Sequence, residues 1–167
     1  TEWPELDIYL TSVTDHYSTA SICGPNSKKI LKKLFPYKDF SDEAFPHMSY
    51  QDAMIDKIEC RIMRISFTGE LSYEINIESK YGKSLWENCI KAGEEYKITP
   101  YGTETMHLLR AEKGFIIVGQ DTDGTMTPID LQMDWIVSKK KYDFIGKRSL
   151  YRSDTIREDR KQLVGLL

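Results

Sequence analysis

The chain has 167 residues, 40% of them hydrophobic and 29% charged, and 26 acidic against 23 basic side chains give a formal net charge of −3. This is an ordinary globular composition, and the length suffices for a domain-sized core. No stretch approaches the roughly 18 to 20 apolar residues that cross a bilayer, which excludes a membrane span. The slight acidic excess argues against nucleic-acid binding, because a phosphate-binding surface needs a basic excess.

Neither the cysteines nor the histidines have the spacing of a metal site. The three cysteines are odd in number, far apart and without a CxxC pair: Cys23, Cys60 and Cys89. The histidines show no HxxxH or HExxH relation: His16, His47 and His107. We therefore expect reduced thiols in a cytoplasmic protein, packed in the core, and no metal site.

The first third of the chain predicts two strands and a helix. Ile8–Val13 and Tyr17–Ile22 are β-branched and aromatic runs separated by three residues, which favours neighbouring strands joined by a tight turn. The Gly-Pro-Asn-Ser run at 24–27 starts a helix that extends to about residue 35 and has a lysine-rich, solvated face. Residues 36–56 contain two prolines and predict a loop or short irregular elements.

The middle of the chain predicts a hairpin followed by two helices. Apolar residues alternate at 58–67 and again at 73–77, which is typical of two strands of a hairpin. Helical spacing at 83–96 and 102–113 predicts two amphipathic helices. The order of elements predicts an α+β fold, with strands 17–22, 58–67 and 73–77 in one mostly antiparallel sheet and the helices near 26–35 and 83–96 packed on one face.

The remainder predicts less regular structure. We expect a short strand or turn at 115–118, a polar loop at 119–128 and a short helix near 129–134. The chain opens without an initiator methionine and closes on an apolar run at 162–167, so we expect it to be a piece of a longer polypeptide.

The run Asp121-Thr122-Asp123-Gly124-Thr125 spells the DxDGT motif of haloacid-dehalogenase-type phosphatases, in which one Asp attacks phosphorus and the second acts as general acid. That chemistry needs the motif at the end of the first strand and about a hundred residues after it. Here only residues 126–167 follow. A turn capped by its own carboxylates is the favoured interpretation.

Glu74 is the more informative acidic residue, because it lies within the alternating apolar strand Tyr73, Ile75, Ile77. Its side chain either faces solvent, which position alone favours, or is directed at hydrogen-bond donors. A buried carboxylate needs paired donors, and the amino group and adjacent ring N–H of a pterin present such a pair.

Three segments carry a resemblance to a known family: RISFTGELSYEI at 64–75, LRAEKG at 109–114 and FIGK at 144–147. Their order and spacing resemble the folate-binding aminomethyltransferase family, which includes the T-protein of the glycine cleavage system. The resemblance implies that residues 1–150 are part of the aminomethyltransferase-like folate-binding domain. Residues 151–167 would be a connector and the first strand of a C-terminal barrel.

Within that family, the segments at 11–14, 101–104 and 109–127 look most like the alpha subunits of heterotetrameric sarcosine oxidases. The likeness implies that the chain is a tetrahydrofolate-binding segment that accepts the one-carbon unit of oxidised sarcosine to form 5,10-methylenetetrahydrofolate. It also implies partner beta, gamma and delta subunits. FAD, FMN and NAD would be bound elsewhere in the parent complex.

The family motif assigns four residues of this chain to the folate site: Glu74, Phe67, Tyr73 and Arg110. Glu74 matches the glutamate that binds the pterin ring, and Phe67 stands where T-proteins usually have a stacking tyrosine. Met106 stands where T-proteins have a pterin-contacting arginine, a departure that favours the oxidase branch. The catalytic aspartate of the family lies upstream of Thr1, so the segment has no catalytic residue and is expected to be inactive alone.

Two other functions remain open from the sequence. The chain is alternatively a fragment of a T-protein or of a dimethylglycine-dehydrogenase-like aminomethyltransferase, or a non-catalytic scaffold related to that family.

Overall fold

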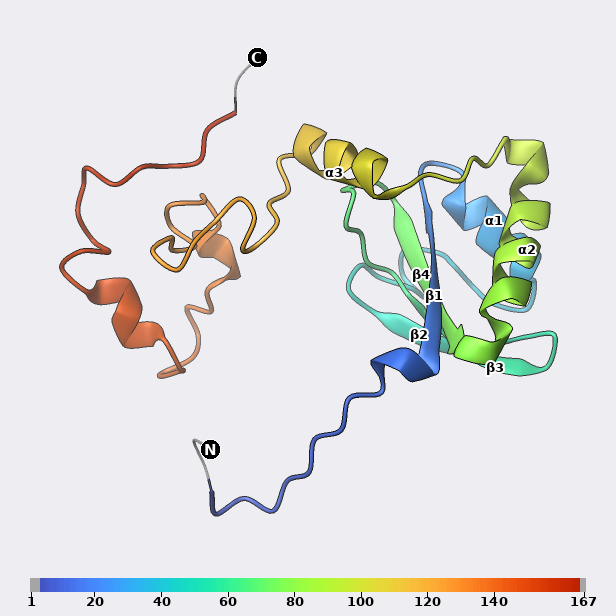
Figure 1. Cartoon of the computed structure of the whole chain (residues 1–167), viewed down its shortest axis with the longest axis horizontal. Helices are drawn as coiled ribbons and strands as arrows, with labels where there is room; N and C mark the ends of the chain where they lie inside the picture. Colours follow the sequence, from blue (N-terminus) through green and yellow to red (C-terminus); the bar gives the residue numbers. More distant parts are fainter. Residues whose placement is uncertain (1–3, 166–167) are drawn as a thin grey trace. The chain divides into compact units, whose positions relative to one another are not determined.

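The structure, a computed structural model, describes residues 4–165 and divides into two compact units, Thr1–Phe115 and Ile116–Leu167 (Figure 1). The first unit holds the sheet and its helices, and the second consists mainly of turns and loops. Each unit is described by itself below.

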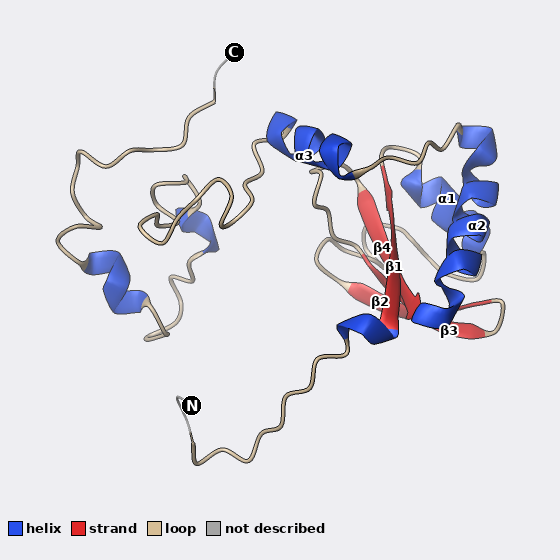
Figure 2. Ribbon diagram, viewed as in Figure 1, coloured by secondary structure: helices blue, strands red, loops and turns tan. Residues whose placement is uncertain are grey.

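The first unit is built on a four-stranded antiparallel sheet (Figure 2). Its strands are β1 (Tyr17–Cys23), β2 (Tyr50–Ile55), β3 (Ile58–Met63) and β4 (Ser72–Glu78), in the order β1-β4-β3-β2. The structure therefore confirms the α+β class and the sheet shared by the predicted strands. It adds β2, which lies within the region expected to be irregular.

Three helices accompany the sheet: α1 (Ser27–Leu34), α2 (Gly82–Gly93) and α3 (Thr103–Glu112). Helices α1 and α2 contact one another, and α2 packs against β1 and β4. Short 3-10 turns occur at Thr14–His16, Ser79–Tyr81, Glu94–Tyr96, Asp134–Ile136 and Lys147–Tyr151. The predicted helices near 26–35, 83–96 and 102–113 are confirmed to within a few residues.

The pleat of β4 separates its side chains onto two faces. Tyr73, Ile75 and Ile77 are buried in the core, while Glu74 and Asn76 lie between them on the opposite face. The core side also contains Leu31, Phe35, Phe40, Phe45, Ile62, Leu85 and Cys89. The burial of the alternate residues thus fixes the face to which Glu74 belongs.

Two parts of the first unit differ from the prediction. Residues 8–13 form no strand, and Ile8 and Leu10 are 62% and 94% exposed, because β1 pairs with β4 only and no described segment pairs with its other edge. β2 and β3 are joined by a tight two-residue turn in which Asp56 and Lys57 both have positive φ, 50° and 65°. Asp-Lys is not among the usual sequences of such a turn, so the hairpin gave no sequence signal.

The second unit contains no strand among its described residues, and the prediction near 129–134 is met by turns that lead into the 3-10 turn Asp134–Ile136. Residues 115–118 form a turn, not a strand. Residues 162–165 form no strand, and Leu166 and Leu167, the end of the predicted barrel strand, lie outside the described residues.

A buried ion pair organises the second unit. Arg160 Nη2 and Nε lie 2.6 and 2.8 Å from the two carboxylate oxygens of Asp130. Asp130 also accepts hydrogen bonds from the amide and hydroxyl of Thr127, and Arg160 donates to the carbonyl of Thr125. The Arg160 guanidinium and the Thr127 bonds hold the pKa of Asp130 far below its ordinary value. This network ties residues 125–130 to a residue 30 positions later.

We predict that Arg160→Gln destabilises the second unit by about 3 kcal/mol, because it leaves the buried Asp130 carboxylate without its charge partner. Arg157→Gln is the matched control, since Arg157 pairs with Asp159 on the surface and such pairs contribute at most about 1 kcal/mol. The measurement is hydrogen exchange of the Thr127 amide. Because the pKa of Asp130 is lowered in the folded chain, the protection of wild type is present above about pH 4 and is lost as the pH falls further. Equal protection in the two variants would contradict the network's role.

Candidate functional site

The segments 64–75 and 109–114, which carry part of the family resemblance, lie next to one another. Glu70 Oε1 lies 3.1 Å from Lys113 Nζ, which links the loop after β3 to the C-terminal end of α3. Gly69 has φ +77° and packs so closely against Lys113 that an added Cβ would lie 2.6 Å from its Cγ. Only glycine therefore fits at this position of the loop.

Glu74 lies on the central strand β4, directly opposite Ser21 of β1 and Met63 of β3. Its side chain is half-buried, and burial raises the pKa of Glu74 above its usual value. Throughout residues 4–165, no group donates a hydrogen bond to this carboxylate and no cation pairs with it. The site thus holds a partly desolvated acceptor whose donors are not supplied by the described part of the chain.

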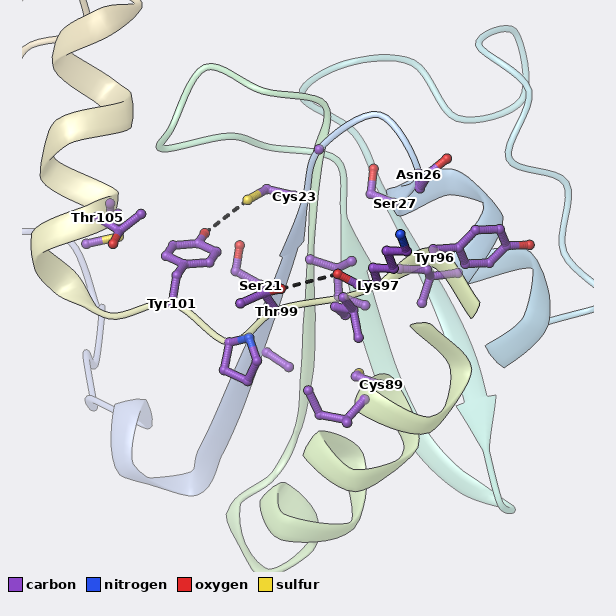
Figure 3. A pocket seen from close by; sticks show the side chains of 18 of the residues that line it. Ser21, Cys23, Asn26, Ser27, Cys89, Tyr96, Lys97, Thr99, Tyr101 and Thr105 are labelled. Atoms are coloured by element: carbon purple, nitrogen blue, oxygen red, sulfur yellow. Dashed lines mark hydrogen bonds between the residues drawn. The ribbon is translucent and has the colours of Figure 1, made fainter. Parts of the chain in front are cut away.

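A small polar cluster adjoins Glu74. The Cys23 thiol donates a hydrogen bond to the Tyr101 hydroxyl, with the sulfur and oxygen 3.1 Å apart, and Ser21 lies beside them (Figure 3). Burial is the main cause that raises the pKa of Tyr101 to about 12, and the negative charge of Glu74 adds to the rise. Tyr101 is therefore a neutral hydroxyl beside the carboxylate at physiological pH.

A cavity of about 680 Å³ extends from this cluster. It is bounded by the end of β1, the start of α1, α2, the segment 96–102 and α3. Its apolar lining includes Ile22, Ile30, Ile90, Ile98, Pro100 and Leu109. Met106, at the position where T-proteins are expected to have an arginine, lines the cavity as well.

The other predicted site residues lie in different surroundings. Phe67 is in the loop after β3 and is 41% exposed. Arg110 is near the end of α3, where its Nη1 donates to the carbonyl of Phe115 at 3.2 Å. Phe67 belongs to the segment 64–75 and Arg110 to the segment 109–114. The aromatic ring of Phe67 and the guanidinium of Arg110 are groups that suit a planar, polar ligand.

Tyr73 is the exception among the predicted site residues. It is fully buried and packs against Phe40 and Phe45, with ring centroids 6.2 and 5.7 Å apart. Because neighbouring residues of a strand point to opposite faces, its ring lies on the other side of the sheet from Glu74. The structure does not bring Tyr73 together with Glu74, and Tyr73 serves the core.

Sequence reasoning missed Ser21, Cys23 and Tyr101. Strand pairing could have indicated Ser21 and Cys23. The antiparallel register of β1 and β4 places Ser21 opposite Glu74, and Cys23 follows on the same face of β1. Tyr101 belongs to the segment 101–104 that carries part of the resemblance, but no local pattern placed it beside Cys23, because it reaches the cluster from a segment that follows α2 by several residues.

The DTDGT loop is held by its own carboxylates. Asp123 Oδ1 accepts hydrogen bonds from the amide and hydroxyl of Thr125, at 2.8 and 2.6 Å. Asp121 Oδ2 accepts from the amide of Ile117 at 2.8 Å. These contacts agree with the interpretation of this run as a capped turn.

Two other classes of site find no support in the described residues. From residue 4 to residue 165, no three His, Cys, Asp or Glu side chains lie close enough to hold a metal ion. None of the helices in this range is long and apolar enough to cross a membrane.

Comparison with known proteins agrees with the resemblance. Residues 1–141 match the family described as GCVT N-terminal domain. The chain is 60% identical, over its full length, to sarcosine oxidase subunit alpha of Corynebacterium sp. (strain P-1), and 39% identical over 99% of its length to that of Rhizobium meliloti (strain 1021). It is 34% identical over 85% of its length to an aminomethyltransferase of Chlorobium limicola, of which it covers 39%. The chain spans 17% of the length of the two subunits.

We predict that Glu74→Gln raises the free energy of unfolding by about 0.5 kcal/mol at pH 7, because it removes a desolvated charge that has no partner. The folded pKa of Glu74 is raised, so the charge costs stability above that pKa. This cost in stability disappears as the pH falls below the pKa of Glu74 in the unfolded chain, which is about 4.3. Urea unfolding at pH 7 and pH 4 measures both effects.

Glu70→Gln is the matched control for this prediction. It removes the partly exposed pair with Lys113, so we expect a small loss of stability instead of a gain. A stability loss for Glu74→Gln at pH 7 would show that the carboxylate is already satisfied within the protein.

Proposed function

We propose, from the premise that this chain belongs to the GCVT N-terminal domain family, that it is the tetrahydrofolate-binding segment of a sarcosine oxidase alpha subunit. The choice of branch is supported by 60% identity to one such subunit, against 34% to an aminomethyltransferase. A T-protein fragment or a non-catalytic scaffold has no comparable observation in its favour.

The observation that carries the proposal is the Glu74 carboxylate, which is half-buried, has a raised pKa and receives no hydrogen bond from residues 4–165. A ligand with two adjacent N–H donors would satisfy both of its oxygens. The pterin ring of tetrahydrofolate has such donors, its amino group and the neighbouring ring N–H. Charge-assisted pairs of this kind are among the stronger hydrogen bonds in proteins.

Two further residues complete the proposed folate contacts. The exposed ring of Phe67 stacks on the face of the pterin, a contact that an aromatic ring makes without a hydroxyl. Arg110 contributes a guanidinium at the end of α3, next to the same loop. Tyr73 is not included, because its ring is in the core.

In this proposal the segment binds and orients folate, and the chemistry begins elsewhere. The parent complex would contain FAD, FMN and NAD together with beta, gamma and delta subunits, and a flavin bound outside this segment would supply the oxidation of sarcosine. The one-carbon unit then reaches the bound tetrahydrofolate and gives 5,10-methylenetetrahydrofolate. Without folate it leaves as formaldehyde. Residues of this chain hold the acceptor in place and take no covalent part.

We predict that Glu74→Gln weakens tetrahydrofolate binding by roughly 30- to 1000-fold, or about 2 to 4 kcal/mol, because an amide nitrogen then faces a donor of the ring. Sarcosine oxidation continues, and its carbon is released as formaldehyde. The measurement is folate titration and product partition in the intact complex.

Glu70→Gln provides the control, since Glu70 lies in the loop that precedes β4 and pairs with Lys113. We expect its folate affinity to stay within a few-fold of wild type. Unchanged folate affinity in Glu74→Gln would refute the proposed contact, and a wild-type complex that binds no folate would establish the scaffold alternative.

A further inference from the structure

A tyrosine hydroxyl lies beside Glu74 on the same face of the sheet. Ser21 stands directly opposite Glu74 in the β1–β4 pairing, and Cys23 follows Ser21 on the face away from the hydrophobic core. The Tyr101 hydroxyl lies 3.1 Å from the Cys23 sulfur, with Ser21 next to it (Figure 3). Besides burial, the charge of Glu74 raises the pKa of Tyr101, because the two groups are close to one another.

The hydrogen bonds of Tyr101 leave its proton without an acceptor. A phenol oxygen has one proton to donate and lone pairs that accept. The Cys23 thiol donates to this oxygen, and a hydrogen bond from Ser21 opposes the rise in the pKa of Tyr101 that burial causes. Between residues 4 and 165, no carbonyl or carboxylate oxygen accepts a hydrogen bond from the Tyr101 hydroxyl. The proton is therefore available to an acceptor on a ligand.

Glu74 and Tyr101 together present an acceptor and a donor to the same space. The two side chains do not bond to one another, although a direct bond would satisfy both. Glu74 is half-buried and Tyr101 is 36% exposed, so a ligand can reach both groups. Because the pKa of Tyr101 is raised to about 12, its hydroxyl keeps the proton at physiological pH. The pair suits a ligand edge on which hydrogen-bond donors stand next to an acceptor.

We propose that Tyr101 is a specificity-determining residue, which donates a hydrogen bond to the carbonyl oxygen O4 of the pterin ring held by Glu74. The inference rests on the proposed function. Along one edge of that ring, the amino group and the ring N–H that Glu74 would bind are followed directly by O4. The carboxylate selects the two donors, and the Tyr101 hydroxyl selects the acceptor beside them. A site with a hydrogen-bonding group for each atom of this edge discriminates against analogues that lack one of them.

The test compares two ligands on the full-length protein in its complex: tetrahydrofolate, and its 4-thioxo analogue, in which sulfur replaces O4 and the ring N–H is kept. Sulfur is a weak hydrogen-bond acceptor. We expect Tyr101→Phe to lower the affinity for tetrahydrofolate about fivefold, which is the size of one hydrogen bond between neutral groups. The affinity for the 4-thioxo analogue should stay unchanged. Continued oxidation of sarcosine by the variant complex reports that it is folded.

Tyr17→Phe is the matched control. Tyr17 is an exposed tyrosine on the same face of β1, but it stands opposite Glu78 and not opposite Glu74. We expect its loss of a hydroxyl to leave both affinities unchanged. Ser21→Ala tests the other hydroxyl next to Glu74, and it should not distinguish the two ligands. A loss specific to tetrahydrofolate in Ser21→Ala, with none in Tyr101→Phe, would assign the contact to Ser21 and overturn the inference.

The two ligands also separate failure of this inference from failure of the proposed function. If Tyr101→Phe leaves tetrahydrofolate binding unchanged while Glu74→Gln weakens both ligands, O4 receives no bond from Tyr101 and the inference is overturned. It is also overturned if Tyr101→Phe weakens both ligands equally, because a purely structural role does not depend on the atom at position 4 of the ring. If Glu74→Gln changes neither affinity, the proposed function itself fails.

Discussion

The pairing of β4 with β1 on one side and β3 on the other sets the pleat of the central strand, and the pleat sets the face of each side chain. Tyr73, Ile75 and Ile77 are buried together, so Glu74 is held on the opposite face. A slip of one residue would place the carboxylate in the core and the tyrosine outside. The hydrophobic core thereby positions a residue that contributes nothing to it.

The rest of the candidate site gathers around that fixed point from distant parts of the chain. Ser21 and Cys23 come from the neighbouring strand, and Tyr101 comes from the segment that leads into α3. The loop after β3 meets the end of α3 through Glu70 and Lys113. A carboxylate without donors is unfavourable for the fold, and such groups are concentrated where proteins bind ligands. The same feature that weakens the fold therefore supports the binding role.

The sequence predicted those parts that depend on local periodicity. The alternation at 73–77 and the helical spacing at 83–96 are strong patterns, and both elements are present. It missed β2, because Asp-Lys is not a typical sequence for a two-residue turn in which both residues, Asp56 and Lys57, are left-handed. It predicted a strand at 8–13 from composition, although a strand also needs a partner, and residues 8–13 pair with no strand of the described chain.

The candidate site also depends on features that local sequence patterns do not report. The family motif assigned both Glu74 and the adjacent Tyr73 to one site, whereas the pleat of β4 places their side chains on opposite faces of the sheet. Tyr101 and the cavity depend on tertiary contacts between segments far apart in the sequence, which no local pattern reports.

The most direct test of the central claim is an NMR titration of the Glu74 carboxyl carbon, without and with saturating tetrahydrofolate. Donors that bind the charged carboxylate stabilise it, so the account predicts a pKa above the ordinary value in the free protein and a fall of at least one unit when folate binds. A pKa that is the same with and without bound folate would contradict the claim that Glu74 receives its hydrogen bonds from the ligand.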